Sequence, residues 1–200
     1  DSAKAIILLE IGESIEQTMP EKSMDYYRQA LAVGQQIKNK NVILSSYMDV
    51  GICNINLNKM DSALIAFEKA IPFARALKDT LMVARVLANM GNAYLHKKDR
   101  VKAIDYYLQS ARLWETCAKQ NYLPVLYSNI NSLLDEQKEH NKALEYGNKA
   151  VALAKKLEDK YSLVNALVNL STTYSYLKQP EKEYALLMEA LPLAKKTTDI

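Results

Sequence analysis

The chain has 200 residues, with 26 Lys and Arg against 23 Asp and Glu, and this net charge of +3 is spread along the sequence, so we expect neither a nucleic-acid nor a membrane-surface partner for this region. Hydrophobic residues make up 49% of the chain, enough for a sizeable core, yet no run of 18 apolar residues marks a membrane span. Five Gly and five Pro are few for a protein of strands and turns, so the composition favours an all-helical chain.

Apolar residues at helical spacing predict helices in pairs along the whole chain. The first helices of the pairs are expected over 3–17, 41–56, 80–96, 121–137 and 160–177. The second helices are expected over 21–37, 61–77, 101–117, 141–157 and 181–196. No single pair buries its apolar face alone, so successive pairs are expected to stack.

Residues at the expected helix ends support this division. Acceptor side chains that can cap the first helices precede three of them, at Asn39, Asp79 and Asp159, while Lys119 is the exception in this column. Asp61 and Asn141 are expected to cap second helices in the same way. Pro72 and Pro192 share one position inside second helices, where the missing N–H predicts a bend or a break.

A shift of 40 residues aligns the pairs with one another. Matching columns hold small residues, aromatic residues and aliphatic residues in turn: Ala63, Ala103 and Ala143; Tyr27, Phe67 and Tyr107; Leu31, Ile71, Val151 and Leu191. The chain is therefore a tandem repeat with approximate units 1–40, 41–80, 81–120, 121–160 and 161–200. The expected fold is all-α, a right-handed superhelix of five two-helix repeats that forms a single domain over 1–200.

These residues resemble the tetratricopeptide repeat (TPR) family, whose pattern joins W-x2-L-G-x2-Y to A-x3-F. The third repeat carries it as Leu87-x2-Met90-Gly91-x2-Tyr94 and then Ala103-x3-Tyr107. The fourth repeat departs from it, with Asn131 for the glycine and Gly147 for the aromatic residue. The 40-residue period resembles the repeats of bacterial signalling proteins: sensor regions of histidine kinases, membrane-tethered transcription regulators and peptide-responsive regulators. That resemblance implies a cytoplasmic or a periplasmic setting and does not choose between them.

The sequence contains no recognisable catalytic, metal-ligating or cofactor-binding motif. His96 and His140 occupy different repeat positions near turns and are interpreted as surface imidazoles. Cys53 and Cys117 fall in packing columns and are interpreted as buried free thiols. Trp114 stands in a column of small residues, where it either fills space or contacts a partner. We therefore expect a protein that is not an enzyme and that uses no cofactor and no metal.

A polar column runs along the first helices, with Asn89, Asn129 and Asn169 at intervals of 40. Since apolar residues flank it on both sides, this stripe is expected to face an inner groove. The predicted groove residues are Asp49, Arg85, Asn89, Asn92, Asn129, Ser132, Asn165 and Asn169. The family resemblance implies that such a groove binds an extended peptide through its backbone, which suits the mixed polarity of these side chains. The alternative is that the asparagines bond neighbouring helices and have no ligand.

Two classes of function are consistent with these patterns. The first is a protein- or peptide-binding module, the sensing or docking region of a larger bacterial signal-transduction or transcription-regulatory protein. The second is a structural scaffold that assembles partners or self-associates, with the C-terminal repeat as the contact because its last helix carries Leu186, Leu187, Leu191 and Leu193. Since Asp199 aligns with the caps Asp79 and Asp159, the chain is expected to be part of a longer protein.

Overall fold

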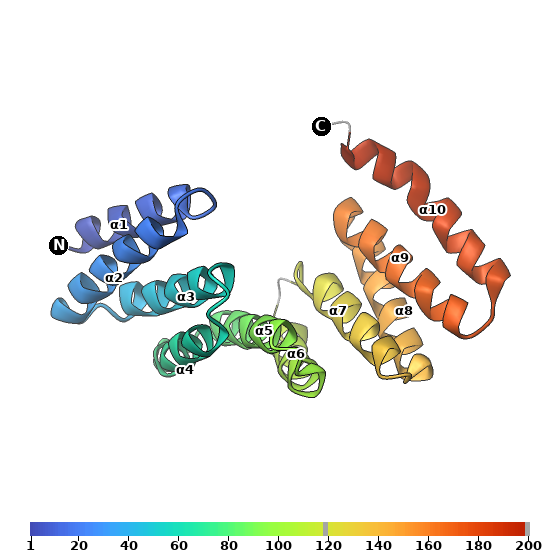
Figure 1. Ribbon diagram of the computed structural model, residues 1–200, viewed down its shortest axis with the longest axis horizontal. Helices are drawn as coiled ribbons and strands as arrows, with labels where there is room; N and C mark the ends of the chain where they lie inside the picture. Colours follow the sequence, from blue (N-terminus) through green and yellow to red (C-terminus); the bar gives the residue numbers. More distant parts are fainter. Residues whose placement is uncertain (118–119, 199–200) are drawn as a thin grey trace. The chain divides into compact units, whose positions relative to one another are not determined.

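The computed structural model describes residues 1–117 and 120–198, and within them it contains only helices, joined by short turns. The helices are α1 (Ser2–Ile15), α2 (Pro20–Gln36), α3 (Lys40–Asn56), α4 (Met60–Ala76), α5 (Thr80–His96), α6 (Arg100–Glu115), α7 (Leu123–Glu136), α8 (His140–Lys156), α9 (Lys160–Tyr176) and α10 (Pro180–Thr198). Figure 1 shows consecutive helices packed as antiparallel hairpins, for example α1 with α2 and α9 with α10. The predicted fold class, an all-α chain of two-helix repeats, is confirmed.

The chain divides into two compact units, Asp1–Tyr106 and Tyr107–Ile200. In the first unit α3 packs on α4 and on α2, and α5 packs on α4. In the second unit α7 packs on α8 and α9, and α10 packs on α9. The single domain expected over 1–200 stays a prediction.

In the first unit, close packing between the two helices of a repeat depends on a glycine. A Cβ atom added at Gly51 of α3 would lie 2.2 Å from the nearest ring atom of Phe67 on α4, and one at Gly12 would lie 2.5 Å from the ring of Tyr27. Both rings are almost fully buried. In both repeats the aromatic residue of the second helix therefore rests directly on the glycine backbone of the first helix, which explains why a glycine and an aromatic residue occur together there.

In the fourth repeat, the small residue and the large residue of this contact have exchanged helices. Asn131 of α7 replaces the glycine, and Gly147 of α8 replaces the aromatic residue. A Cβ atom at Gly147 would lie 3.3 Å from the Asn131 amide and 2.8 Å from a terminal methyl of Leu170. The two departures from the family pattern are thus one compensated change, which puts a polar amide where the second and third repeats have the glycines Gly51 and Gly91.

The predicted capping residues of the first helices are confirmed, whereas the prediction for the second helices is wrong. Asn39, Asp79 and Asp159 each accept a bond from a backbone N–H in the first turn of the helix that follows. Helices α4 and α8 begin before Asp61 and Asn141, so both residues lie inside the first turn and neither is the cap. Lys119 and Asp199, the other members of this column, lie outside the described residues.

The turns between helices share one geometry that the sequence patterns did not predict. Seven described residues have left-handed φ values between 55° and 64°. Neighbouring members of this set are 20 positions apart, or 40 in one case: Lys38, Asn58, Lys78, Lys98, Lys138, Glu158 and Lys178. The next residue then bonds back to a carbonyl in the helix, as Asn39 N does to Gly34 O at 2.9 Å. This is a Schellman ending built without glycine, and it gives successive helices the same reversal.

Neither internal proline interrupts its helix. Helix α4 continues through Pro72 to Ala76, and α10 continues through Pro192. The predicted break at these prolines therefore does not occur. Both rings are exposed, so water can satisfy the carbonyls that the proline nitrogens leave without a donor.

Candidate functional site

The eight predicted groove residues all lie on first helices, and none of them is buried. Asp49 lies on α3, and Arg85, Asn89 and Asn92 lie on α5, in the first unit. Asn129 and Ser132 lie on α7, and Asn165 and Asn169 lie on α9, in the second unit. Arg85, Ser132 and Asn165 are exposed, and the other five residues are half-buried. Each unit therefore presents its own part of this polar stripe.

In the first unit, Asp49 lies in an acidic environment. Burial, followed by the negative charges of Glu16 and Glu13, raises the pKa of the Asp49 carboxyl to about 7, and the positive charge of Arg85 opposes this rise only weakly. Asp49 on α3 and Arg85 on α5 are thus close enough to interact electrostatically. Glu13 of α1 and Glu16, which directly follows this helix, were not predicted, because in that repeat the polar asparagine column is occupied by Leu9.

Two hydrogen bonds hold the Glu16 side chain in place. Its oxygens accept from the Tyr27 hydroxyl at 2.7 Å and from the Asn56 amide at 2.6 Å. On α5 the amide of Asn92 donates to the Asn89 oxygen at 3.5 Å, a long bond within one helix. The exposed side of the first unit is therefore acidic at α1 and α3, and carries amides and Arg85 at α5.

In the second unit, two predicted asparagines bond neighbouring helices. The Asn169 amide on α9 donates to the Ser128 carbonyl of α7 at 3.3 Å, and Asn129 bonds the phenol of Tyr107. Each amide has two donor hydrogens and a carbonyl oxygen with two lone pairs, so one such bond leaves capacity for a ligand. These contacts show that the column has a structural role in this unit, and they leave its ligand role as a prediction.

A pocket of about 170 Å³ lies between α7 and α9 on this stripe, and we call it the α7–α9 pocket. It is lined by Ser132, Asp135, Glu136, Asn169, Thr172 and Tyr176. Two of the predicted groove residues, Ser132 and Asn169, therefore share one hollow. Asp135 was not predicted, although a signal existed: three of the other four residues in its repeat column are the apolar Ile15, Ile55 and Leu95, and the fourth is Ser175.

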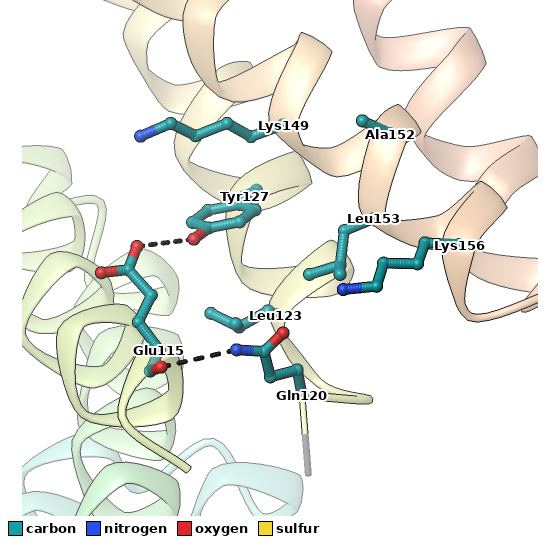
Figure 2. Close-up of a pocket in the computed structure, with 8 residues that line it drawn as sticks. All are labelled: Glu115, Gln120, Leu123, Tyr127, Lys149, Ala152, Leu153 and Lys156. Atoms are coloured by element: carbon teal, nitrogen blue, oxygen red, sulfur yellow. Dashed lines mark hydrogen bonds between the residues drawn. The ribbon is translucent and has the colours of Figure 1, made fainter. Parts of the chain in front are cut away.

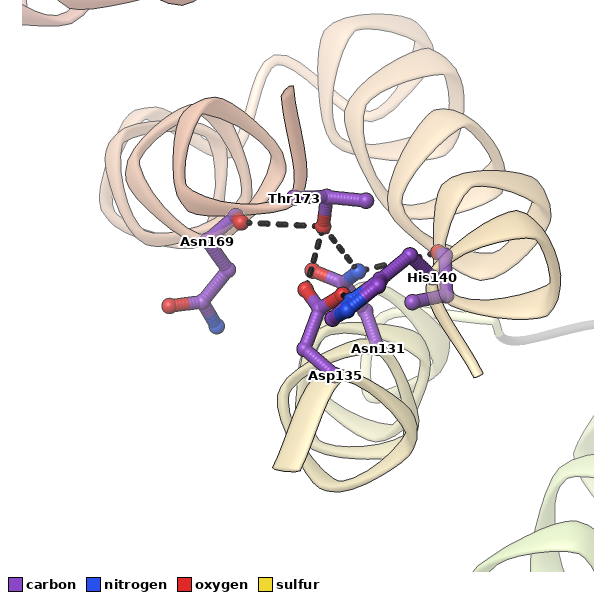
Figure 3. Close-up of polar contacts among 6 residues, drawn as sticks. Asn131, Asp135, His140, Asn169 and Thr173 are labelled. Carbon is purple, nitrogen blue, oxygen red and sulfur yellow. Dashed lines mark hydrogen bonds and ion pairs between the residues drawn. The ribbon is translucent and has the colours of Figure 1, made fainter. Parts of the chain in front are cut away.

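Behind this pocket, a buried polar cluster connects α7, α8 and α9 (Figure 3). Thr173 donates to Asp135 Oδ2 at 2.5 Å, and His140 Nδ1 lies 2.8 Å from Asp135 Oδ1. Asn131 donates to Thr173 Oγ1 at 2.8 Å and to the Ala143 carbonyl at 2.9 Å. His140 also stacks on Tyr176, with ring centroids 4.8 Å apart. His140 is consequently part of a packed cluster, and its interpretation as a plain surface imidazole was wrong.

A second hollow, of about 400 Å³, lies on the side of α7 that faces α8 (Figure 2). Its walls include Leu123, Ala152 and Leu153, with Lys149 and Lys156 among the polar lining residues. Tyr127 donates to Glu115 at 2.6 Å within it, and burial together with Glu115 raises the pKa of the Tyr127 phenol. None of the predicted groove residues lines this hollow.

The remaining candidates from the sequence have structural roles or none that the structure reveals. Cys53 is buried, Cys117 is half-buried, and both are free thiols. Trp114 is buried and packs near Tyr122, with ring centroids 5.8 Å apart, so it fills space. His96 is exposed. Among the residues that the structure describes, no group of three His, Cys, Asp or Glu is placed to hold a metal ion. No helix over the described ranges has the length and apolar character of a membrane span.

Comparisons with known proteins agree with the repeat architecture. A family model described as Tetratricopeptide repeat matches residues 82–156 and 122–196. No curated protein matches the chain.

Several solved structures are similar to this chain over nearly its whole length. The STAND protein with a tetratricopeptide repeat sensor from Pyrococcus horikoshii matches with a TM-score of 0.87 and 21% identity, over 99% of this chain and 31% of that one. A Rap protein complexed with Competence and Sporulation Factor matches with a TM-score of 0.75 and 16% identity, over 99% of this chain and 66% of that one. The kinesin light chain TPR-like repeats of Podosopora anserina match with a TM-score of 0.78 and 13% identity, over 98% of each chain. At these identities the similarity establishes the fold.

Proposed function

Because this chain belongs to the tetratricopeptide repeat family, whose repeats generally mediate protein–protein interaction, we propose that it binds an extended protein or peptide segment along the predicted groove. The observation that carries this proposal is the amide column, in which Asn89, Asn129 and Asn169 all remain half-buried at the surface of first helices. An amide there can donate to and accept from a peptide backbone at a modest desolvation cost. A site of this kind binds and does not catalyse, so we propose that the chain is not an enzyme.

We further propose that the module is the sensing or docking region of a larger bacterial signal-transduction or transcription-regulatory protein. Two similar structures support this setting. One belongs to a signal-transduction ATPase in which the repeats are the sensor, and the other is a Rap protein complexed with Competence and Sporulation Factor.

Substitution of Asn129 tests the groove directly. An array of capped decapeptides supplies the tightest-binding peptide as the probe, and we expect Asn129→Ala to weaken its binding five- to thirty-fold, or about 1–2 kcal/mol, because the amide bonds the peptide backbone. Isothermal titration calorimetry measures the change. The matched control is Asn148→Ala, an exposed amide on α8 away from the stripe. Equal affinity of Asn129→Ala and the wild type, with both folded, would show that the column is structural only.

A second candidate function is self-association through α10. Four large side chains of this helix are well exposed: Tyr184, Leu187, Met188 and Leu191. An apolar strip of this size on one helix is typical of a contact surface. In this alternative the protein is a scaffold, and the predicted groove needs no ligand.

The double substitution Leu187→Glu and Leu191→Glu tests this alternative. We expect it to shift a self-associating chain to monomer in sedimentation equilibrium, because two carboxylates on each copy oppose burial of the strip. Val101→Glu, at an exposed apolar residue of α6, is the control and should leave the association unchanged. A wild-type chain that is monomeric at every concentration tested would eliminate this candidate.

A further inference from the structure

The hollow between α7 and α8, which we call the α7–α8 hollow, lies where the second repeat has an additional aromatic ring. In that repeat the Phe73 ring of α4 packs against the Tyr47 ring of α3, with ring centroids 6.1 Å apart. A shift of two repeats puts Tyr127 in the place of Tyr47 and the smaller Leu153 in the place of Phe73. Tyr127 and Leu153 both line the hollow. The fourth repeat therefore keeps one ring of this pair and lacks the other.

The first helix of this repeat also begins late. Helices α3, α5 and α9 begin at residues 40, 80 and 160, whereas α7 begins at Leu123 and not at residue 120. Gln120 and Leu123 line the hollow at this end, so α7 supplies no helical turn there. The volume of about 400 Å³ lies within the range of about 300–1,000 Å³ that is usual for ligand pockets. The hollow therefore has room for a side chain as large as phenylalanine.

Two lysines of α8 border the hollow, and neither forms an ion pair with a residue that the structure describes. Lys149 and Lys156 are seven residues apart on one face of the helix, and Figure 2 shows them on either side of Leu153. The adjacent Lys155, by contrast, pairs with Glu189 at 2.7 Å. Both bordering lysines are exposed, so their ammonium groups are accessible to a partner.

Among the described residues that line the hollow, Glu115 contributes the one carboxylate. This carboxylate accepts from the Tyr127 hydroxyl at 2.6 Å. The lining therefore carries two positive charges against one negative charge, which favours an acidic ligand. The pair of lysines is specific to this repeat. The other second helices have different residues at the two positions: Gln29 and Gln36, Lys69 and Ala76, Gln109 and Thr116, and Glu189 and Lys196.

We infer that the α7–α8 hollow is a docking site for a segment of a partner protein that inserts a phenylalanine between two acidic residues. The ring takes the place beside Tyr127 that Phe73 occupies beside Tyr47 in the second repeat. Lys149 and Lys156 are two helical turns apart, about 10 Å along the axis, which is close to the span of three residues in an extended chain. Carboxylates three residues apart can therefore reach both ammonium groups. None of the eight predicted groove residues lines this hollow, so the inference goes beyond the proposed function and does not depend on it.

Three capped octapeptides test the inference: acetyl-GGEFGEGG-amide, its Gln analogue acetyl-GGQFGQGG-amide and its Ala analogue acetyl-GGEAGEGG-amide. We expect the first peptide to bind about tenfold tighter than the Ala analogue, because its ring is buried. It should bind about fivefold tighter than the Gln analogue, which cannot form the two exposed ion pairs. Titrations followed by carbon–proton NMR measure the affinities, and the methyl signals of Leu123 and Leu153 should shift.

Two variants separate the contribution of the ring from that of the charges. Leu153→Phe restores the ring of the second repeat, so it should weaken the first peptide about tenfold and leave the Ala analogue unchanged. Lys149→Gln with Lys156→Gln should reduce the first peptide to the affinity of the Gln analogue, and should not change that analogue. The control, Lys69→Gln with Lys160→Gln, removes the same charge from exposed lysines outside the hollow and should change none of the affinities.

Equal binding of the three peptides, or no binding by any of them, would overturn this inference and leave the proposed groove standing. Peptide-induced shifts at the side-chain amides of Asn129 and Asn169, with none at Leu123 and Leu153, would place the peptide in the groove and overturn it as well. A third outcome against it is a wild-type chain whose self-association in sedimentation equilibrium is lost in the double lysine variant. The occupant of the hollow would then be a second copy of this chain.

Discussion

We expect Gly51→Ala to lower the free energy of unfolding by about 2 kcal/mol, although alanine is the better helix former by about 1 kcal/mol. The reason is the Phe67 ring, which lies 2.2 Å from the position of the added Cβ atom. Phe67 is fully buried among the packed side chains of α3, α4 and α5. The ring cannot move away without displacing its neighbours, so the added methyl group strains the core. Urea denaturation of the two proteins measures the difference.

Gly147→Ala is the matched comparison for this prediction. It is the same substitution inside a helix, but the nearest atom is a terminal methyl of Leu170 at 2.8 Å, which can rotate away. We expect a loss of less than about 1 kcal/mol there, because the gain in helix propensity offsets part of the strain. In a Phe67→Leu background the cost of Gly51→Ala should shrink, since the ring is gone. A Gly51→Ala protein as stable as the wild type would show that the ring does not rest on this backbone.

We expect Asp49→Asn to stabilise the protein by about 1–2 kcal/mol at pH 8 and to have little effect near pH 4. Burial and the neighbouring Glu16 and Glu13 raise the pKa of Asp49 to about 7. The folded protein therefore holds this proton more tightly than the unfolded chain, whose carboxyl has a pKa of about 4. Stability from this residue is complete below about pH 4 and is lost as the pH rises through 7. The expected gain in the free energy of unfolding is smaller than the whole pKa shift would give, because Asp49 is partly exposed and solvent screens its charge.

Thermal and urea unfolding at about pH 4.5, 6 and 8 check this prediction. In the wild type, ionisation of Asp49 lowers stability as the pH rises. Asparagine cannot ionise, so the variant should not show this fall in stability between the lowest and the highest pH. Glu10→Gln, at an exposed residue of α1, serves as the control for removing one negative charge. An Asp49→Asn variant with the same pH dependence as the wild type would mean that this carboxyl stays ionised in the folded protein. Its peptide affinity, measured alongside, reports whether the acidic end of the first unit contributes to binding.

Most of the local structure follows from the sequence by itself. Helix positions repeat every 40 residues because the pattern of small, aromatic and aliphatic side chains does, and the described helix ends fall within about three residues of those expected. The caps Asn39, Asp79 and Asp159 were predictable because a cap bonds only to residues two or three positions away. The half-buried position of Asn89 and its equivalents at the surface of the first helices followed from apolar neighbours on both sides of the same helix face.

Only the tertiary structure decided the contacts between helices. Asn131 and Gly147 each looked like a departure from the repeat, and their packing shows that one compensates the other across α7 and α8. Asp135 and Thr173 are 38 positions apart and form a hydrogen bond, so no short-range pattern joins them. Periodicity records which face of a helix is apolar, because that depends on neighbours three or four residues away. Which polar side chain meets which across two helices depends on how the helices pack, and here that packing produces the acidic α7–α9 pocket.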